Sequence, residues 1–278
     1  MHPDVLIAYE WPLRLGGFVL LSLALVALER AHAFREASAR PQRWLKHLGL
    51  AAIGALLVRI ALPIAAVGTA LHAQAQGLGL SHLLFPAPRP LLLELALGLA
   101  CWLILDAAIY LQHRVFHAWP PLWRLHRVHH SDVEFDTSTA IRFHPLEIAL
   151  SMAIKMALVL ALGAPAWAVL LFELSLSLSA LWTHANLHLP DPLDRRLRWL
   201  LVTPDMHRIH HSVRPHETDS NFGFCLSLWD RLFASYRAAS EAPQQQMAIG
   251  LDEFRSPRSQ KLLALLALPF RRRDTEAS

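Results

Sequence analysis

The sequence predicts an all-α fold: an integral-membrane helical bundle of about four to five membrane helices with a cytoplasmic helical cap. Three observations support this prediction. The 278-residue chain is 54% hydrophobic and only 17% charged, whereas soluble domains are roughly 45–50% apolar and about 25% charged. Five stretches are long and apolar enough to enter a bilayer. Most of the 17 histidines lie in motifs that follow these stretches rather than inside them.

The predicted membrane helices occupy residues 11–28, 47–71, 90–111, 146–162 and 166–183. Gly163, Ala164 and Pro165 separate the last two, and this composition is typical of a turn. Because both of these helices are short, we expect a tight hairpin that either spans the bilayer or enters only part of it. Acidic residues precede the first stretch and no cleavage site follows it, which favours a retained helix over a signal peptide.

The basic residues predict the orientation of these helices. Arginine and lysine are frequent at residues 30–46, after the first helix, whereas residues 73–87, after the second, contain neither. Arginines recur at 114–142 and from residue 195 onward. Cytoplasmic loops carry an excess of lysine and arginine. We therefore expect the N-terminus outside, and both histidine-rich segments and the C-terminus inside.

Four histidine motifs follow the third and fifth predicted helices. They are His113-x-x-x-His117, His126-x-x-His129-His130, His184-x-x-x-His188 and His207-x-x-His210-His211. Residues four apart share one helical face about 6 Å apart, so two such imidazoles can bind one metal ion. Adjacent histidines diverge by about 100° and reach either two neighbouring ions or one ion from different sides. Ten histidines are too many for one ion and suit two, and imidazole suits iron, copper, zinc and nickel.

Surface, haem-binding and zinc-protease roles fit these histidines less well. A single such pair is ordinarily a surface feature, but four motifs on one membrane face are not. Membrane haem proteins use one histidine pair per haem, within the bilayer, and need no adjacent histidines. The His-Glu-x-x-His motif of zinc proteases is absent from the sequence. The histidines without partner spacing are predicted to be ordinary polar residues: His2, His32, His47, His72, His82 and His216.

Between residues 106 and 236 the sequence contains further specific strings: TAIRFHPLE at 139–147, TPDMH at 203–207 and NFGFCLSLWDRLF at 221–233. With the histidine motifs, these strings resemble the fatty acid hydroxylase/sterol desaturase superfamily of membrane-bound, histidine-box di-iron proteins. Residues 234–236 read Ala-Ser-Tyr where the family usually has Gly-Thr-Tyr. The first hundred or so residues carry little of the resemblance.

The resemblance implies that the metal ligands are the ten histidines of the four motifs: His113, His117, His126, His129, His130, His184, His188, His207, His210 and His211. They would bind two iron ions, with O2 as co-substrate, and zinc or another metal could replace iron in a purified sample. His144 is expected to be structural or to support the ligands. Carboxylates and amides that could orient the rings are Asp106, Asp132, Asp136, Asp205, Asp219 and Asn221.

The resemblance also implies an O2-dependent oxidoreductase that hydroxylates a membrane lipid, such as an acyl chain or a sterol. A desaturase on the same scaffold is the alternative, because both reactions begin by removing hydrogen. A non-redox, histidine-rich metal-binding or transport protein should carry ionisable residues along its helices; here only Arg59, Lys155 and Glu173 are predicted to be deep. No nucleotide-binding or haem motif is found, so a reductase, ferredoxin or cytochrome is expected to supply electrons.

Three regions are expected: N-terminal membrane helices at 1–95, a fatty acid hydroxylase-like catalytic domain at 96–240, and a cytoplasmic or interfacial tail at 241–278. The tail has one apolar run, 262–270, followed by three arginines, which indicates a surface-lying or disordered end. The net charge of 26 − 22 = +4 is mild and predicts no nucleic-acid partner. Cys101 and Cys225 are too few and too far apart for a disulfide framework.

Overall fold

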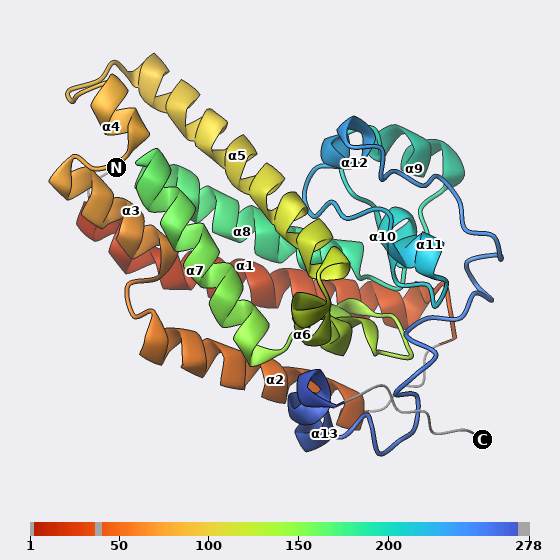
Figure 1. Ribbon diagram of the computed structural model, residues 1–278. Coiled ribbons are helices and arrows are strands. Elements are labelled where there is room, and N and C mark those ends of the chain that lie inside the picture. The colour runs from red at the N-terminus through yellow and green to blue at the C-terminus, as the bar shows by residue number, and fades with distance from the viewer. Residues whose placement is uncertain (1–2, 37–40, 272–278) are drawn as a thin grey trace.

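The chain folds into a bundle of long helices with most of its short helices gathered at one end (Figure 1). The structure is a computed structural model and describes residues 3–36 and 41–271. The segments long and apolar enough to cross a membrane lie in α1 (Pro3–His32), the segment Pro41–Leu84, α5 (Leu91–Ala118), α7 (Pro145–Leu162) and α8 (Ala166–Thr183). The predicted all-α membrane bundle is thereby confirmed.

The second predicted membrane helix is divided in two. α2 (Pro41–Ala61) begins earlier than expected, and α3 (Ala65–Gln76) follows after a break at Pro63. Proline has no backbone N–H and its ring clashes with the preceding turn, so it ends or kinks a helix. One continuous helix over 47–71 is therefore wrong, and the chain changes direction between the two helices that replace it (Figure 1).

The turns at the end of the bundle opposite the histidine motifs pack together. Ser81 of α4 (Leu80–Leu84) donates a hydrogen bond of 2.6 Å to the carbonyl of Gly163, in the turn between α7 and α8. Gly163 ends α7 with φ +63, a conformation that glycine adopts without a Cβ clash. These turns lie at one end of the bundle and the histidine motifs at the other (Figure 1), as the predicted topology requires.

The cap at the histidine end is built from α6 (Pro120–His130), the 3-10 helix η1 (Thr137–Ile141), α9 (Asp191–Leu197), α10 (Pro204–His210), α11 (Pro215–Thr218) and α12 (Leu228–Leu232). The C-terminal segment then returns across the cap as α13 (Leu262–Ala267) and η2 (Leu268–Phe270). Its Leu265 and Leu268 pack against Leu50 of α2 and Val128 of α6. The tail is thus docked on the cap up to residue 271, and residues 272–278 lie outside the described part.

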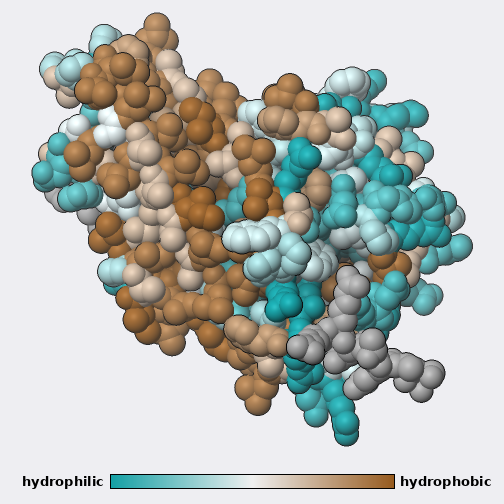
Figure 2. All heavy atoms as spheres, viewed as in Figure 1, coloured by the Kyte–Doolittle hydropathy of each residue, from teal (hydrophilic) through white to brown (hydrophobic). Residues whose placement is uncertain are grey.

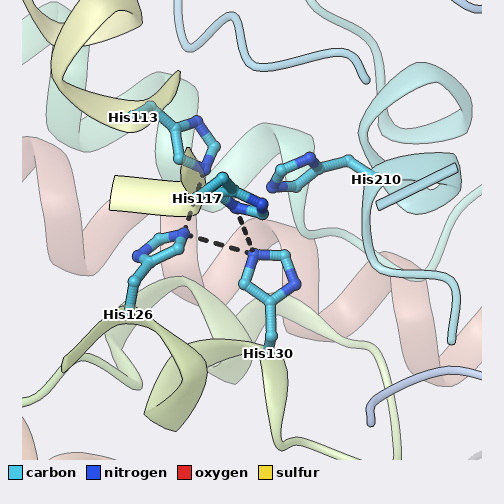
Figure 3. A group of neighbouring side chains, drawn as sticks. All are labelled: His113, His117, His126, His130 and His210. Carbon is cyan, nitrogen blue, oxygen red and sulfur yellow. Dashed lines mark hydrogen bonds between the residues drawn. The ribbon is translucent and has the colours of Figure 1, made fainter. Parts of the chain in front are cut away.

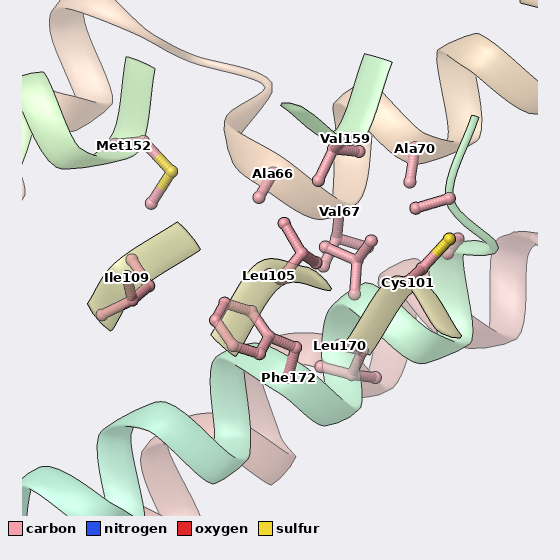
Figure 4. Packing of buried hydrophobic residues seen from close by; sticks show 13 residues of the cluster. Ala66, Val67, Ala70, Cys101, Leu105, Ile109, Met152, Val159, Leu170 and Phe172 are labelled. Carbon is pink, nitrogen blue, oxygen red and sulfur yellow. The ribbon is translucent and has the colours of Figure 1, made fainter. Parts of the chain in front are cut away.

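Apolar side chains cover the outside of the long helices, and polar ones cover the cap (Figure 2). Leu20, Leu56 and Leu92 are examples of apolar side chains that are more than half exposed. Inside the bundle, residues such as Leu105 and Phe172 pack into a continuous core (Figure 4). An outward-facing apolar surface over helices of this length suits hydrocarbon rather than water. The chain is an integral membrane protein.

Candidate metal centre

Five histidines converge where α5 meets the cap. His113 and His117 come from α5, His126 and His130 from α6, and His210 from α10. Figure 3 shows their rings directed toward one another. One ring nitrogen of each lies within 4.8 Å of the corresponding nitrogen of every other. This first cluster joins two consecutive helices, α5 and α6, to α10, which lies much farther along the sequence.

Four more histidines form a second cluster beside the first. The Nε2 atom of His184, which follows α8, lies 3.1 Å from Nε2 of His129, 3.1 Å from that of His207 and 3.2 Å from that of His211. The rings of His130 and His211 stack across the two clusters with centroids 4.6 Å apart. Each adjacent histidine pair therefore contributes one ring to each cluster, which is the two-ion arrangement left open by the spacing.

The hydrogen-bond partners of two rings indicate that the first cluster is suited to a cation. The Phe222 carbonyl can only accept, so His113 donates to it from Nδ1 at 2.7 Å. An ionised Glu147 carboxylate can also only accept, and His126 then donates to it from Nδ1 at 2.7 Å. A neutral imidazole carries one N–H, so both Nε2 atoms present lone pairs, and these atoms are 3.0 Å apart. Two lone pairs this close repel each other, and a metal ion between them would remove the repulsion.

Other rings are held in the same way. Nδ1 of His184 donates to the Ala180 carbonyl at 2.7 Å, and Nδ1 of His210 donates to the Ser220 carbonyl at 2.8 Å. His117 pairs through Nδ1 with Asp219 at 3.1 Å. A hydrogen bond at one ring nitrogen fixes the tautomer and directs the other nitrogen to the metal. In the second cluster, Nδ1 has no partner among the described residues on three rings: His129, His207 and His211.

Burial keeps the clustered histidines of the cap neutral. It lowers the pKa of His126 to about 3 and the pKa of His184 to about 4. Burial first, and then neighbouring histidines, lower the pKa well below its ordinary value for His129, His130, His207, His210 and His211. Neutral imidazole is the form that binds metal ions. At neutral pH the two clusters therefore offer lone pairs rather than protons.

The tenth predicted ligand, His188, lies outside both clusters. Its side chain is 42% exposed, and its Nδ1 lies 2.9 Å from Asp205. Its ring stacks on Phe34, with centroids 4.7 Å apart. The segment after α8 turns away from the cluster beyond His184, because residues 184–190 are not helical. The four-residue spacing therefore does not bring these two rings together here.

Of the six residues predicted to orient the rings, Asp219 contacts a clustered histidine and Asp205 contacts His188. Asp106 instead accepts from the Trp229 indole at 2.8 Å. Histidine spacing did not predict that Glu147 contacts His126. The only sign of this role in the sequence was the position of Glu147 in the string at 139–147.

The remaining histidines have no place in the clusters. His144 caps α7 by accepting from the Leu146 amide at 3.2 Å, a structural role. The described histidines without partner spacing lie outside both clusters, and His2 lies outside the described residues.

An ion-pair network ties α2 to the segment after α6. Arg43 bonds Asp132 at 2.6 Å and also pairs with Asp136. On the other side, Arg142 donates to the Val128 carbonyl at 2.9 Å. Burial alone would raise the pKa of Asp132, but the two arginines hold it well below its usual range. This network, the Arg43 network, fixes the end of α6, where two of the clustered histidines lie.

A cavity of about 790 Å³ runs through the bundle to the first cluster. Its walls come from α1, α2, α5, α7 and α8, and His113 and His126 line one end. Exposed, lipid-facing side chains such as Leu56 and Ile64 line another part. A cavity between membrane helices can thus receive a molecule from the bilayer and bring it to the histidines.

The fold and site define a class of protein: a membrane-helix bundle capped by two adjoining histidine clusters. Residues 98–235 match the family described as fatty acid hydroxylase. The chain therefore belongs to the fatty acid hydroxylase/sterol desaturase superfamily, as the strings and histidine motifs predict.

Its relatives include the ornithine lipid hydroxylase OlsE of Rhizobium tropici, 29% identical over 68% of this chain and 54% of the relative. Alkylglycerol monooxygenases are also similar: that of Homo sapiens is 31% identical over 51% of this chain and 31% of its own length. That of Danio rerio is 33% identical over 49% and 29%. The chain thus spans about half the length of the first relative and less than a third of the others. No solved structure matches it.

Proposed function

We propose that this protein is an O2-dependent, non-haem di-iron oxidoreductase that hydroxylates a membrane lipid. The observation that carries the proposal is the pair of adjoining histidine clusters at the end of a cavity between membrane helices. The proposed ligands are the nine clustered histidines of the four motifs, and His188, the tenth ligand that the resemblance implies, lies outside the clusters. The proposed catalytic domain, 96–240, contains every one of these residues.

Two iron ions, when bound, supply the oxidising power that an unactivated C–H bond requires. Hydroxylation balances when one O2, two electrons and two protons convert the C–H bond into C–OH and one water. A separate donor must deliver the electrons, and we propose a reductase, ferredoxin or cytochrome. The chain's own residues hold the imidazoles neutral, direct their Nε2 atoms inward and keep bulk water from them.

Two further observations support the proposal. The relatives are named as a hydroxylase of ornithine lipid and as monooxygenases of alkylglycerol, which favours a lipid substrate. The arginine-rich segments lie on the cap side, which favours a cytoplasmic active site. A substrate drawn from the bilayer would then meet an electron donor from the cytoplasm at one face of the membrane.

Metal analysis and lipid analysis test this function together. We expect purified protein to carry about two transition-metal ions per chain, with iron as the active metal. Zinc can replace iron in such a sample, because imidazole sites also accept zinc. Membranes of an expressing host should gain lipids one oxygen heavier than their precursors. Lipids two hydrogens lighter would identify desaturation instead. One ion or none in a folded preparation would contradict the di-metal centre.

A further inference from the structure

The cavity has a polar wall next to the first histidine cluster. Glu147, Ser151 and Lys155 follow one another at four-residue spacing on α7 and line the cavity, so they share one helix face. Gln112 of α5 lines it too, and its Nε2 donates to Ser151 Oγ at 3.1 Å. Hydrocarbon alone cannot satisfy such groups, because a buried polar group costs free energy unless it is hydrogen-bonded.

Two oxygen atoms on this wall lack a partner. Gln112 Oε1 and Glu147 Oε2 are buried and make no hydrogen bond to any described residue. Glu147 is only 4% exposed, and its other oxygen accepts from His126. Buried acceptors are usually paired; Gln112 Oε1 can only accept, and Glu147 Oε2 accepts an O–H or N–H when the carboxyl is ionised. They lie at the histidine end, because Gln112 directly precedes His113 and Glu147 touches His126.

The other charged side chains of the cavity have partners, and Arg59 donates to the Pro63 carbonyl at 3.2 Å. Lys155 pairs with Glu173, whose second oxygen accepts from Arg14 at 2.9 Å. Arg14 also pairs with Glu10 at 2.9 Å. Charges inside a membrane protein are costly unless they are paired in this way. This charged group lies about 12 Å along α7 from Glu147, eight residues away, so the free acceptors and the charged group mark two different parts of the cavity.

We propose that the substrate is a lipid with a hydroxyl or amine donor in its polar end, and that this donor binds Gln112 and Glu147. The oxidised carbon then lies close to the polar end, and the hydrocarbon tail extends along the apolar walls toward Leu56 and Ile64. This inference rests on the proposed function and specifies its substrate. The reverse orientation would place the polar end at Lys155 and oxidise carbons far along the tail.

Binding of two matched lipids tests the proposal. The probes are hexadecylglycerol and its dimethyl ether, which has the same chain and no O–H donor. We expect the purified full-length protein to bind hexadecylglycerol about tenfold more tightly, because hydrogen bonds to buried acceptors are lost with the ether. Gln112→Met removes one acceptor, and Ser151→Ala removes the partner that orients it. Each should reduce the preference to about twofold or less.

The matched control is Ser177→Ala. Ser177 lines the same cavity, but its hydroxyl already donates to the Glu173 carbonyl at 2.9 Å, so this variant should keep the full preference. Thermal unfolding without lipid establishes that each variant is folded. Tryptophan fluorescence or calorimetry measures the affinities, and neither readout requires turnover.

Equal affinity of the unmodified protein for the two lipids would overturn the proposal. So would products oxidised near the end of the hydrocarbon tail. A protein that carries two ions and oxidises lipids without this preference retains the proposed function and loses the substrate inference. A protein that shows the preference but holds no metal keeps the donor-binding site and loses the proposed chemistry.

Discussion

The orientation of several clustered imidazoles depends on the atom that the second ring nitrogen meets. For His113, His184 and His210 that atom is a backbone carbonyl. A carbonyl is present at every residue, so no side-chain pattern identifies which one the fold will bring to a ring. Glu147 is different, because a carboxylate is visible in the sequence, but its distance of 21 residues from His126 matches no helical spacing.

Single substitutions separate clustered histidines from the others. His129→Ala and His210→Ala should abolish activity and lower the metal content, because each removes one imidazole from a buried cluster. His72→Ala and His216→Ala should do neither. His188→Ala distinguishes the resemblance from the structure. The resemblance implies that His188 is a metal ligand, whereas in the structure its ring contacts Asp205 and Phe34.

From the structure we expect His188→Ala to retain the metal content of the unmodified protein. Elemental analysis of folded, membrane-inserted protein provides the measurement for all five variants. Loss of metal from His188→Ala equal to that from His129→Ala would show that the ring joins the centre. An equal loss of metal from all five variants would show that the motifs do not distinguish ligands from other histidines.

At the scale of helices, the Arg43 network connects a membrane helix to the cap. α2 carries none of the proposed ligands, yet its Arg43 reaches two aspartates in the segment after α6. Asp132 is 1% exposed, so it depends on a cationic partner. The position of the segment after α6, and with it the end of α6, therefore depends on an element from the N-terminal region.

Arg43→Met should destabilise the cap by about 3–5 kcal/mol, because removal of one partner leaves a buried charge uncompensated. Thermal unfolding in detergent and the metal content of the same sample measure the effect. The matched control is Arg196→Met, on the exposed surface of α9, which should change little. Adding Asp132→Asn to Arg43→Met should recover part of the loss, and an undiminished loss would argue against the ion pair as its cause.

At the scale of the whole molecule, the turn end and the histidine end lie at opposite ends of the bundle (Figure 1), so helices that cross the bilayer fully would expose these ends on opposite sides of the membrane. The α7–α8 hairpin returns the chain to the end from which it started (Figure 1). Both histidine segments therefore meet on one side, which assembly of either cluster requires. The charge distribution favours the cytoplasm as that side.

Cysteine labelling tests this topology in a background with Cys101 and Cys225 replaced by alanine. Ala75→Cys, on the exposed face of α3 near the turn end, should react with an impermeant thiol reagent in intact cells. Arg195→Cys, exposed on the cap, should react only after permeabilisation. The reverse pattern would move the active site to the outer face, and labelling of both positions in intact cells would contradict a bundle that spans the membrane.

The sequence by itself determined the membrane helices and the histidine motifs, because both signals act within one helix. Apolar length and a spacing of three or four residues need no knowledge of the partner element. Pro63 was also a local signal, and it marks the break between α2 and α3 that a continuous apolar stretch concealed. The family strings were readable for the same reason, since each is a short run of neighbouring residues.

Only the tertiary structure decided which histidine belongs to which cluster, and that His188 lies apart. These outcomes depend on how α5, α6 and α10 approach one another, and contacts between distant residues such as Arg43 and Asp132 control that approach. The free acceptors Gln112 and Glu147 come from α5 and α7 and face one cavity only because the bundle closes around it. Local spacing places side chains on a face, whereas the packing of whole helices places that face against its partner.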